Sequence, residues 1–352
     1  MNLTCNKVIF EDCKKSCTDI ECFSILDNQS IFVSGGTGFM GKWITEMVSY
    51  INETGKYNIK LYLLGRDISK FKDEVPHLAE KPFVSLIEQD VRYLHNVPSD
   101  VNYIIHAAGT PDNREHVSHP LKTIETFYKG TQSVLDAATR LPDLRKIVHI
   151  SSHQVYGRND TENLINEHFT GTLEPITVSN SYAESKRISE TLCSYYRNFY
   201  GLPINILRPF SFIGPYQDLE KPWAINSFIR DGLLNESIRI LGNGLSERSY
   251  LYASDMAYWI VKSLISEKGG ENYNLGSRHA ISLNKLADIV KEQFGYNINI
   301  ISKSAKDEDI KISRLVPNVD KIKKALGVKE NFSLDEAIFR TIFWNKIKEI
   351  KK

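Results

Sequence analysis

The segment "SIFVSGGTGFMGKWI", residues 30–44, joins a short apolar run to a cluster of glycines. Its first part, Ile31 to Val33, has the β-branched and aromatic character of a buried strand, and the residues after Gly41 have the apolar spacing of a helix. Glycines between a strand and a helix permit a tight turn and let backbone N–H groups approach a phosphate. The segment therefore predicts a dinucleotide-binding turn, with a ligand-free β–α turn as the alternative.

From residue 29 onward, apolar strand-like segments alternate with amphipathic helical ones. Strands are predicted at 30–34, 59–64, 83–87, 102–106, 146–151 and 204–208, and helices at 40–53, 119–140 and 180–200. Such alternation is typical of βαβ units that build a parallel sheet covered on both faces. We therefore expect an α/β fold: a Rossmann-type doubly wound parallel sheet with a smaller C-terminal α/β substrate lobe.

The chain divides into three predicted parts. Residues 1–28 read as a short helical extension that packs on the main domain. Residues 29–208 form the dinucleotide-binding domain, to which a segment at about 245–275 returns. The sequence after Arg208 is rich in Pro and aromatic residues, so residues 209–352 are assigned mainly to the substrate lobe. A cleft between two lobes is a common ligand position.

The composition is that of an ordinary globular protein. Of the 352 residues, 41% are hydrophobic and 25% are charged, and the net charge is +1. This charge gives no electrostatic footprint for nucleic acid or an anionic membrane, and no apolar run approaches the ~18 residues of a membrane span. The N-terminus lacks the layout of a signal peptide. We expect a cytoplasmic protein with neither kind of partner.

Cysteine is concentrated at the N-terminus. The five cysteines are Cys5, Cys13, Cys17, Cys22 and Cys193. Zinc sites usually combine such spacings with histidines or a second cysteine pair, and the first histidine is His77. We therefore expect free thiols in a reducing compartment and no metal, with metal or disulfide chemistry as the alternative.

The end of the second predicted strand, "LYLLGRD", bears on the choice of cofactor. An acidic residue there would bind the ribose 2′-OH of NAD, whereas an arginine nearby accommodates the 2′-phosphate of NADP. Gly65 occupies the expected acidic position and Arg66 follows it. Asp67 could still turn toward the ribose. The sequence favours NADP(H) and leaves NAD(H) open.

Other residues fit the same cofactor site. Asp90 and Val91 follow the third predicted strand, where adenine would lie, and small residues end the fourth strand, where the cofactor passes closely. Helix–strand packing is the alternative reading of these small residues. The full set of predicted cofactor contacts in the glycine loop and at the strand ends is Gly35, Gly38, Phe39, Met40, Gly41, Arg66, Asp90, Val91, Ala107, Ala108 and Gly109.

Two segments carry candidate catalytic residues. "HISSHQVYG" (149–157) ends a predicted strand, and "SNSYAESKRISETL" (179–192) opens a helix on which Tyr182 and Lys186 share one face. A phenol has an ordinary pKa of ~10, which a nearby ammonium and a bound nicotinamide cation would lower. Tyr182 is therefore a candidate acid–base group, Lys186 can also hold the nicotinamide ribose, and Ser152 can polarise a substrate carbonyl.

These motifs together resemble the extended short-chain dehydrogenase/reductase family of the NAD-dependent epimerase/dehydratase type, which acts on nucleotide sugars. The resemblance spans roughly residues 29–345, through "GGTGFMG", "HAAG", "SSHQVYG", "YAESK", "LRPFSFIGP", "RSYLYASDMA" and "YNLG". It implies a catalytic triad of Ser152, Tyr182 and Lys186 and a sugar nucleotide across the lobe boundary, and it suggests a role in polysaccharide biosynthesis. The helices at 119–140 and 180–200 resemble those of a four-helix homodimer interface in the family.

The resemblance also implies substrate contacts. Arg248 matches the family position that pairs with the nucleotide diphosphate, with a structural salt bridge as the alternative, and Ser211 stands where many relatives carry Asn. The full set of predicted substrate contacts is Ser152, His153, Ser211, Asn226, Arg248 and, as the weaker candidate, Arg314. His153 is included as a residue that either donates a hydrogen bond to the sugar or stacks in the wall of the site.

The residues after Ser152 bear on the reaction. Related 4,6-dehydratases carry an Asp-Glu pair there, whereas this chain has His153 and Gln154, and a glutamine cannot transfer protons. A 4,6-dehydratase is therefore not expected. The cofactor argument favours an NADPH-dependent reductase of a nucleotide-linked 4-keto-6-deoxy sugar. The alternatives are a 4-epimerase with retained NAD, a decarboxylase of a nucleotide-linked uronic acid, and a catalytically silent nucleotide-binding module.

Overall fold

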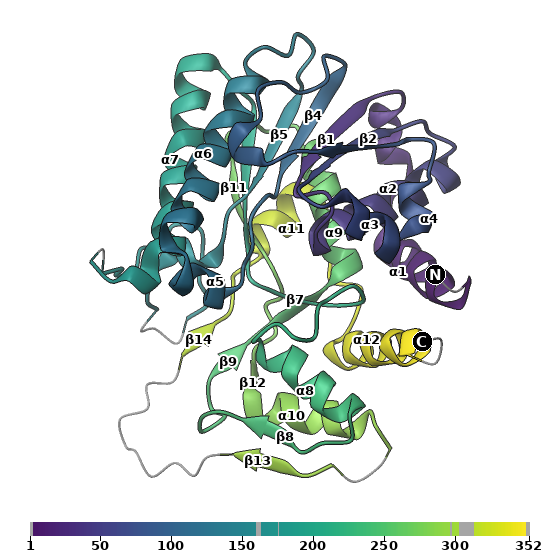
Figure 1. Ribbon diagram of the computed structural model, residues 1–352, viewed down its shortest axis with the longest axis vertical. Coiled ribbons are helices and arrows are strands. Elements are labelled where there is room, and N and C mark those ends of the chain that lie inside the picture. Colours follow the sequence, from purple (N-terminus) through teal and green to yellow (C-terminus); the bar gives the residue numbers. More distant parts are fainter. Residues whose placement is uncertain (1–2, 160–162, 175, 296–297, 303–312, 350–352) are drawn as a thin grey trace.

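The computed structural model describes residues 3–159, 163–174, 176–295, 298–302 and 313–349 (Figure 1). Within these residues the central element is a seven-stranded parallel sheet in the order β11-β6-β5-β4-β1-β2-β3. Its strands are β1 (Ser30–Ser34), β2 (Lys60–Gly65), β3 (Val84–Glu88), β4 (Val101–His106), β5 (Lys146–Ile150), β6 (Ile204–Pro209) and β11 (Asn272–Leu275). This order confirms the expected Rossmann-type sheet.

The predicted strands lie within one residue of the observed ones at both ends. Parallel strands buried on both faces read as continuous apolar runs, and β1 and β5 are buried along their whole length. The last strand of the sheet, β11, comes from the segment predicted to return to this domain, and it pairs with β6.

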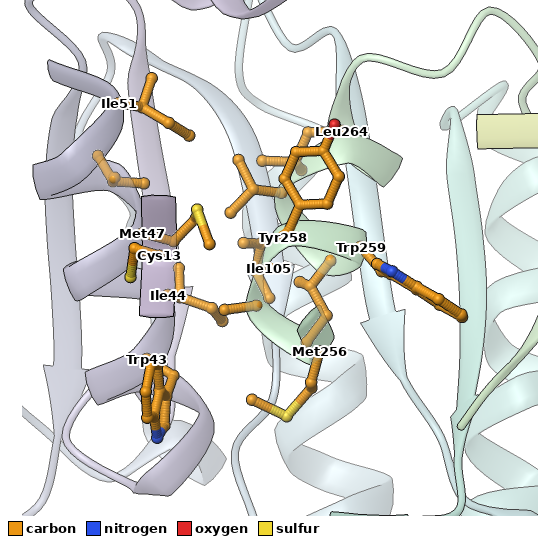
Figure 2. Packing of buried hydrophobic residues seen from close by; sticks show 14 of the residues in the cluster. Cys13, Trp43, Ile44, Met47, Ile51, Ile105, Met256, Tyr258, Trp259 and Leu264 are labelled. Carbon is orange, nitrogen blue, oxygen red and sulfur yellow. The ribbon is translucent and has the colours of Figure 1, made fainter. Parts of the chain in front are cut away.

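Helices cover both faces of the sheet (Figure 1). One face carries α6 (Pro120–Ala138) and α7 (Ser181–Tyr200), whose buried residues share a cluster with β5 and β6. The other face carries α2 (Phe39–Gly55) and α9 (Ala253–Leu264). Figure 2 shows Trp43, Ile44 and Met47 of α2 opposite Met256 and Tyr258 of α9. Shorter helices near β2 and β3 are α3 (Ile68–Glu74) and α4 (Pro76–Ala79).

The N-terminal extension forms α1 (Leu3–Ser16) and the 3-10 turn η1 (Glu21–Leu26), and its buried residues share a cluster with α2 and α9. Several of its polar contacts are buried. Asp12 accepts a hydrogen bond from the Tyr252 hydroxyl at 2.6 Å and pairs with Arg340, while the Ser16 hydroxyl donates to Asp255 at 2.7 Å. Burial raises the pKa of Asp12 to about 7. The extension is therefore bonded to elements from the far end of the chain.

A second group of elements follows β6. Three small sheets pair β7 (Ser211–Ile213) with β10 (Tyr250–Tyr252), β8 (Ile238–Ile240) with β13 (Ile300–Ser302), and β9 (Glu247–Arg248) with both β12 (Ile281–Ser282) and β14 (Arg314–Leu315). The helices here are α8 (Ala224–Leu233), α10 (Leu283–Glu292), α11 (Asp320–Leu326) and α12 (Leu334–Glu349). Apart from α11, they share a separate apolar core, which includes Phe228, Leu286 and Ile338.

The remaining short elements lie near the carboxyl ends of the sheet strands. They are η2 (Val91–Tyr93), α5 (Asn113–Ser118), η3 (His153–Tyr156) and η4 (Val178–Asn180). None of the described helices combines the length and the apolar character that a bilayer span requires.

Candidate active site

The glycine loop makes the turn from β1 into α2. Gly35 has a φ of +72°, which favours glycine, and a Cβ atom there would meet the Ala107 carbonyl oxygen at 2.7 Å. Gly38 is the residue before the first turn of α2, and its carbonyl accepts the Lys42 N–H at 2.9 Å. The loop therefore brings unobstructed backbone to a helix N-terminus, the arrangement that binds a pyrophosphate.

A cleft of about 1800 Å³ opens from this loop and runs between the carboxyl ends of the sheet strands and the elements after β6. Ligands of doubly wound sheets bind at these strand ends. The predicted residues that line the cleft are Gly35, Gly38, Phe39, Met40, Arg66, Asp90, Val91, Ala107, Ala108, Gly109, Ser152, His153, Tyr182, Lys186, Ser211 and Arg248.

Within the described part of the chain, three predicted contacts are not among the lining residues. A Cβ atom at Gly41 would meet the Gly36 carbonyl oxygen at 2.2 Å, so this glycine lets α2 pack against the turn. Asn226 is fully buried and donates to the Asp218 carbonyl at 2.8 Å, which ties α8 to the loop before it. Arg314 forms an ion pair with Glu247 at 3.0 Å.

Ser152, Tyr182 and Lys186 lie together on the cleft wall. Each side chain is almost fully buried, with exposed fractions of 4%, 6% and 5%. Lys186 donates from Nζ to the Ile150 carbonyl at 2.7 Å, and this nitrogen is 4.3 Å from the centre of the Phe127 ring. The helical spacing thus places the amine and the phenol in one pocket at the end of β5.

The protonation of this pocket is governed by burial. Burial raises the pKa of Tyr182 to about 12, and a hydrogen bond with Ser152 offsets part of that shift. Burial also lowers the pKa of Lys186 to about 7, opposed by the nearby Glu190 carboxylate. The lowering of the phenol pKa expected from the lysine is therefore not present here, and Tyr182 holds its proton.

His153 and Gln154 begin η3 directly after Ser152, and both line the cleft. The His153 ring stacks on Phe210 with centroids 5.2 Å apart, and its Nδ1 donates to the Pro209 carbonyl at 3.2 Å. Burial lowers the pKa of His153 to about 4, so the ring is neutral and Nε2 is left as the acceptor nitrogen.

Arg248 lies on β9 and lines the cleft from the opposite side. Its Nη1 donates to the Glu247 and Ser313 carbonyls at 2.7 and 2.9 Å. Two backbone carbonyls fix the side chain without neutralising its charge. A fixed, charged guanidinium can bind an anionic group such as a diphosphate.

Two aromatic neighbours of Tyr182, His116 and Phe127, were not predicted from the sequence. His116 of α5 stacks on the phenol ring with centroids 4.2 Å apart and an interplanar angle of 7°. No spacing rule links positions 116 and 182, which are on different helices, so only the folded chain reveals the pair.

The model of the NAD-dependent epimerase/dehydratase family matches residues 31–276, more than half of the chain. The chain belongs to this family. Among curated proteins it is 28% identical over 317 residues to UDP-glucuronic acid decarboxylase 5 of Arabidopsis thaliana, covering 88% of this chain and 87% of the relative. It is 26% identical over 325 residues to UDP-glucuronic acid decarboxylase 1 of Xenopus tropicalis, covering 92% and 74%.

Solved structures of the family share the fold. UDP-glucose 4-epimerase of Thermotoga maritima superposes with a TM-score of 0.76 at 22% identity, covering 91% of this chain and 100% of the epimerase. UDP-glucuronic acid 4-epimerase of Bacillus cereus, solved with UDP-glucuronic acid and NAD, gives 0.77 at 20% identity, with the same coverage. The family model confirms the expected resemblance to the NAD-dependent epimerase/dehydratase type, and these structures show that the fold is shared.

In this family member, Tyr182→Phe should reduce turnover of a nucleotide sugar by about 100-fold or more, because it removes the hydroxyl and keeps the ring. Affinity for the dinucleotide should change by less than about twofold. Steady-state kinetics and cofactor titration measure the two effects. Tyr200→Phe, an exposed tyrosine on the same helix, is the matched control. Turnover retained by the Tyr182 variant would rule out the role of the phenol.

Proposed function

We propose that this chain is an NADPH-dependent reductase of a nucleotide-linked 4-keto-6-deoxy sugar. The observation that carries the proposal is the end of β2, where the adenosine ribose of a dinucleotide would lie. A carboxylate free to bind the 2′-OH would favour NAD. The residues at this strand end support NADP(H) instead.

Three residues at the end of β2 carry the cofactor argument. A Cβ atom at Gly65 would meet the Thr37 hydroxyl oxygen at 2.3 Å, so an acidic side chain there requires Thr37 to move. Asp67 uses its Oδ1 to accept the Lys70 N–H at 2.8 Å as the cap of α3. Arg66 is exposed at the rim of the cleft, where its guanidinium can bind a 2′-phosphate.

Reduction of a carbonyl requires a proton donor, and Tyr182 in the cleft carries a proton. Reduced nicotinamide, when bound, supplies a hydride to the C4 carbonyl carbon. Tyr182 donates its proton to the carbonyl oxygen, and Ser152 polarises the same oxygen by a hydrogen bond. A phenol that holds its proton before the substrate arrives suits this role as a proton donor.

The side chains beside Ser152 support reduction over dehydration. Elimination of water across C5 and C6 requires a second acid and a second base. His153 is neutral and has Nδ1 committed to Pro209, and Gln154 cannot exchange protons. Nε2 of His153 could serve as only one of these two groups, and Gln154 cannot supply the other.

A decarboxylase of a nucleotide-linked uronic acid is the second candidate, because eight curated relatives at 25–28% identity carry the name UDP-glucuronic acid decarboxylase. Such an enzyme oxidises its substrate first and therefore works with a retained oxidised cofactor. A 4-epimerase has the same requirement. Co-purification of a tightly bound dinucleotide would favour either of these over the reductase.

The purified protein, mixed with NADPH and a 4-keto-6-deoxy sugar nucleotide, should oxidise the cofactor, with absorbance loss at the nicotinamide band. A panel of thymidine, cytidine, guanosine and uridine diphosphate sugars covers the choice of base. A matched reaction with a uronic acid nucleotide and NAD tests the decarboxylase. Absence of NADPH consumption with every 4-keto nucleotide would rule out the reductase.

Arg66→Ala should raise the KM for NADPH by about tenfold or more and leave the KM for NADH nearly unchanged, because it removes only the contact with the 2′-phosphate. Steady-state kinetics with both cofactors measure the ratio. Arg145→Ala, at an exposed arginine between α6 and β5, is the control. An equal effect on both cofactors would contradict the assignment of Arg66.

We also propose that the protein is a homodimer through α6 and α7, which lie side by side on one flank of the molecule (Figure 1). These helices expose large apolar side chains to solvent. The most exposed are Leu121 of α6, at 76%, and Phe199 of α7, at 74%, with Ile124, Tyr128, Ile188 and Tyr195 partly exposed beside them. Burial of such a face against a second copy is a strong driving force for association.

Leu121→Glu combined with Phe199→Glu should convert the dimer into a monomer, because both charges would lose water at the interface. Light scattering coupled to size exclusion measures the mass. Leu241→Glu alters an equally exposed leucine, 86% exposed and outside these two helices, and should leave the dimer intact. A wild-type monomer would rule out this assembly.

A further inference from the structure

The ring of His116 lies flat on the ring of Tyr182, with 4.2 Å between their centroids. Phe127 makes a T-shaped contact with each of these rings, with an interplanar angle of 75° to His116 and of 80° to Tyr182. The imidazole is itself buried, with an exposed fraction of 2%. One face of the phenol is therefore covered by a planar side chain and one side by a second aromatic ring.

The orientation of the imidazole is fixed by a single strong hydrogen bond. Nε2 donates to the Thr110 carbonyl at 2.7 Å, and because a carbonyl only accepts, this nitrogen carries the proton. Nδ1 is buried without a hydrogen-bond partner among the described residues. Burial lowers the pKa of His116, so the ring is neutral at physiological pH.

The helix that carries His116 is tied to both sides of the cleft. Its cap, Asp112, forms ion pairs with Arg114 at 2.8 Å and with Lys221 of the loop before α8 at 3.0 Å. On the other side, the hydroxyl of Ser181, the residue before Tyr182, donates to the His116 carbonyl at 3.5 Å. The imidazole is therefore placed on the phenol by anchored backbone.

We propose that His116 is a positioning residue that holds the phenol ring of Tyr182 in one orientation and covers one of its faces against water. The proposal deepens the reductase function, and it rests on that function only for the direction in which Tyr182 transfers its proton. A proton donor must be held in the correct geometry, since a displacement of about 1 Å can cost about 100-fold in rate.

The titratable groups around the stack of His116 on Tyr182 determine how removal of the imidazole affects the pKa of Tyr182. Asp112, Glu115 and Lys186 act on His116, whereas burial is the main influence on Tyr182, with Ser152 as its hydrogen-bond partner. Loss of the imidazole admits water to the phenol face and leaves these neighbours in place. The pKa of Tyr182 then falls from about 12 toward its ordinary value.

The test uses the full-length protein in four forms: wild type, His116→Ala, His116→Phe and Val117→Ala. His116→Phe keeps a planar ring, and Val117→Ala truncates an exposed neighbour on the same helix. His116→Asn replaces the alanine variant if that variant does not fold. Tyrosine labelled with ¹³C reports ionisation of the phenol by NMR, and Tyr182→Phe assigns its resonance.

We expect the Tyr182 resonance to move toward the phenolate position at about pH 10 in His116→Ala, and not in the other three forms. In turnover, His116→Ala should lose about tenfold or more in kcat with little change in KM, and His116→Phe should recover most of that loss. An unmoved resonance in His116→Ala, or equal losses in the alanine and phenylalanine variants, would overturn the proposal. The NMR result needs no substrate, so it stands apart from failure of the reductase assay.

Discussion

The candidate site depends on one buried amine. Lys186 is almost fully removed from water, and transfer of an ammonium group into such surroundings is costly unless other groups receive its hydrogen bonds. The Ile150 carbonyl accepts one bond, and the face of Phe127 offers a cation–π contact. These partners fix the position of the amine, but they do not compensate for the loss of water around its charged form. The pKa of Lys186 therefore falls to about 7.

The nearest carboxylate on the same helix is used elsewhere. Glu190 lies one turn beyond Lys186, but both of its oxygens bind the guanidinium of Arg208, at 2.9 and 2.6 Å, and one also accepts the Ser151 hydroxyl. Arg208 in turn donates to the Tyr156 hydroxyl at 3.1 Å. This network fixes β5, β6 and α7 to each other. Because Glu190 is paired with Arg208, it does not form an ion pair with Lys186, and the charge of the lysine depends on the groups that a bound ligand brings into the cleft.

Much of the fold could be predicted from the sequence because most strands of the sheet are buried on both faces and a cluster of glycines marks the turn after β1. The pair Tyr182 and Lys186 could be found for a similar reason, since a helix puts residues four apart on one face. Contacts between distant segments could not be found. The stack of His116 on Tyr182 joins two helices that are far apart in the sequence, so it depends on how they pack.

The direction of the Tyr182 pKa shift could not be predicted from the sequence either. Spacing reveals that an ammonium is near, which argues for a lower pKa, but it does not reveal how much water is excluded. In the folded chain, exclusion of water dominates, and the pKa of the phenol rises to about 12 while the pKa of the amine falls. Both shifts have the same cause, namely that neither charged form is well solvated in the pocket.

This shared cause links the pocket to the kind of reaction it favours. An enzyme that begins by oxidising a hydroxyl must remove a proton, so it needs a tyrosine that ionises readily. An enzyme that begins with a carbonyl must give a proton, so it needs a tyrosine that keeps one. The buried phenol, shielded by His116 on one face and bonded to Ser152, holds its proton, which is the state from which the proposed reduction starts. The proposed reduction thus draws on two separated places, the proton-bearing phenol and the strand end at Gly65.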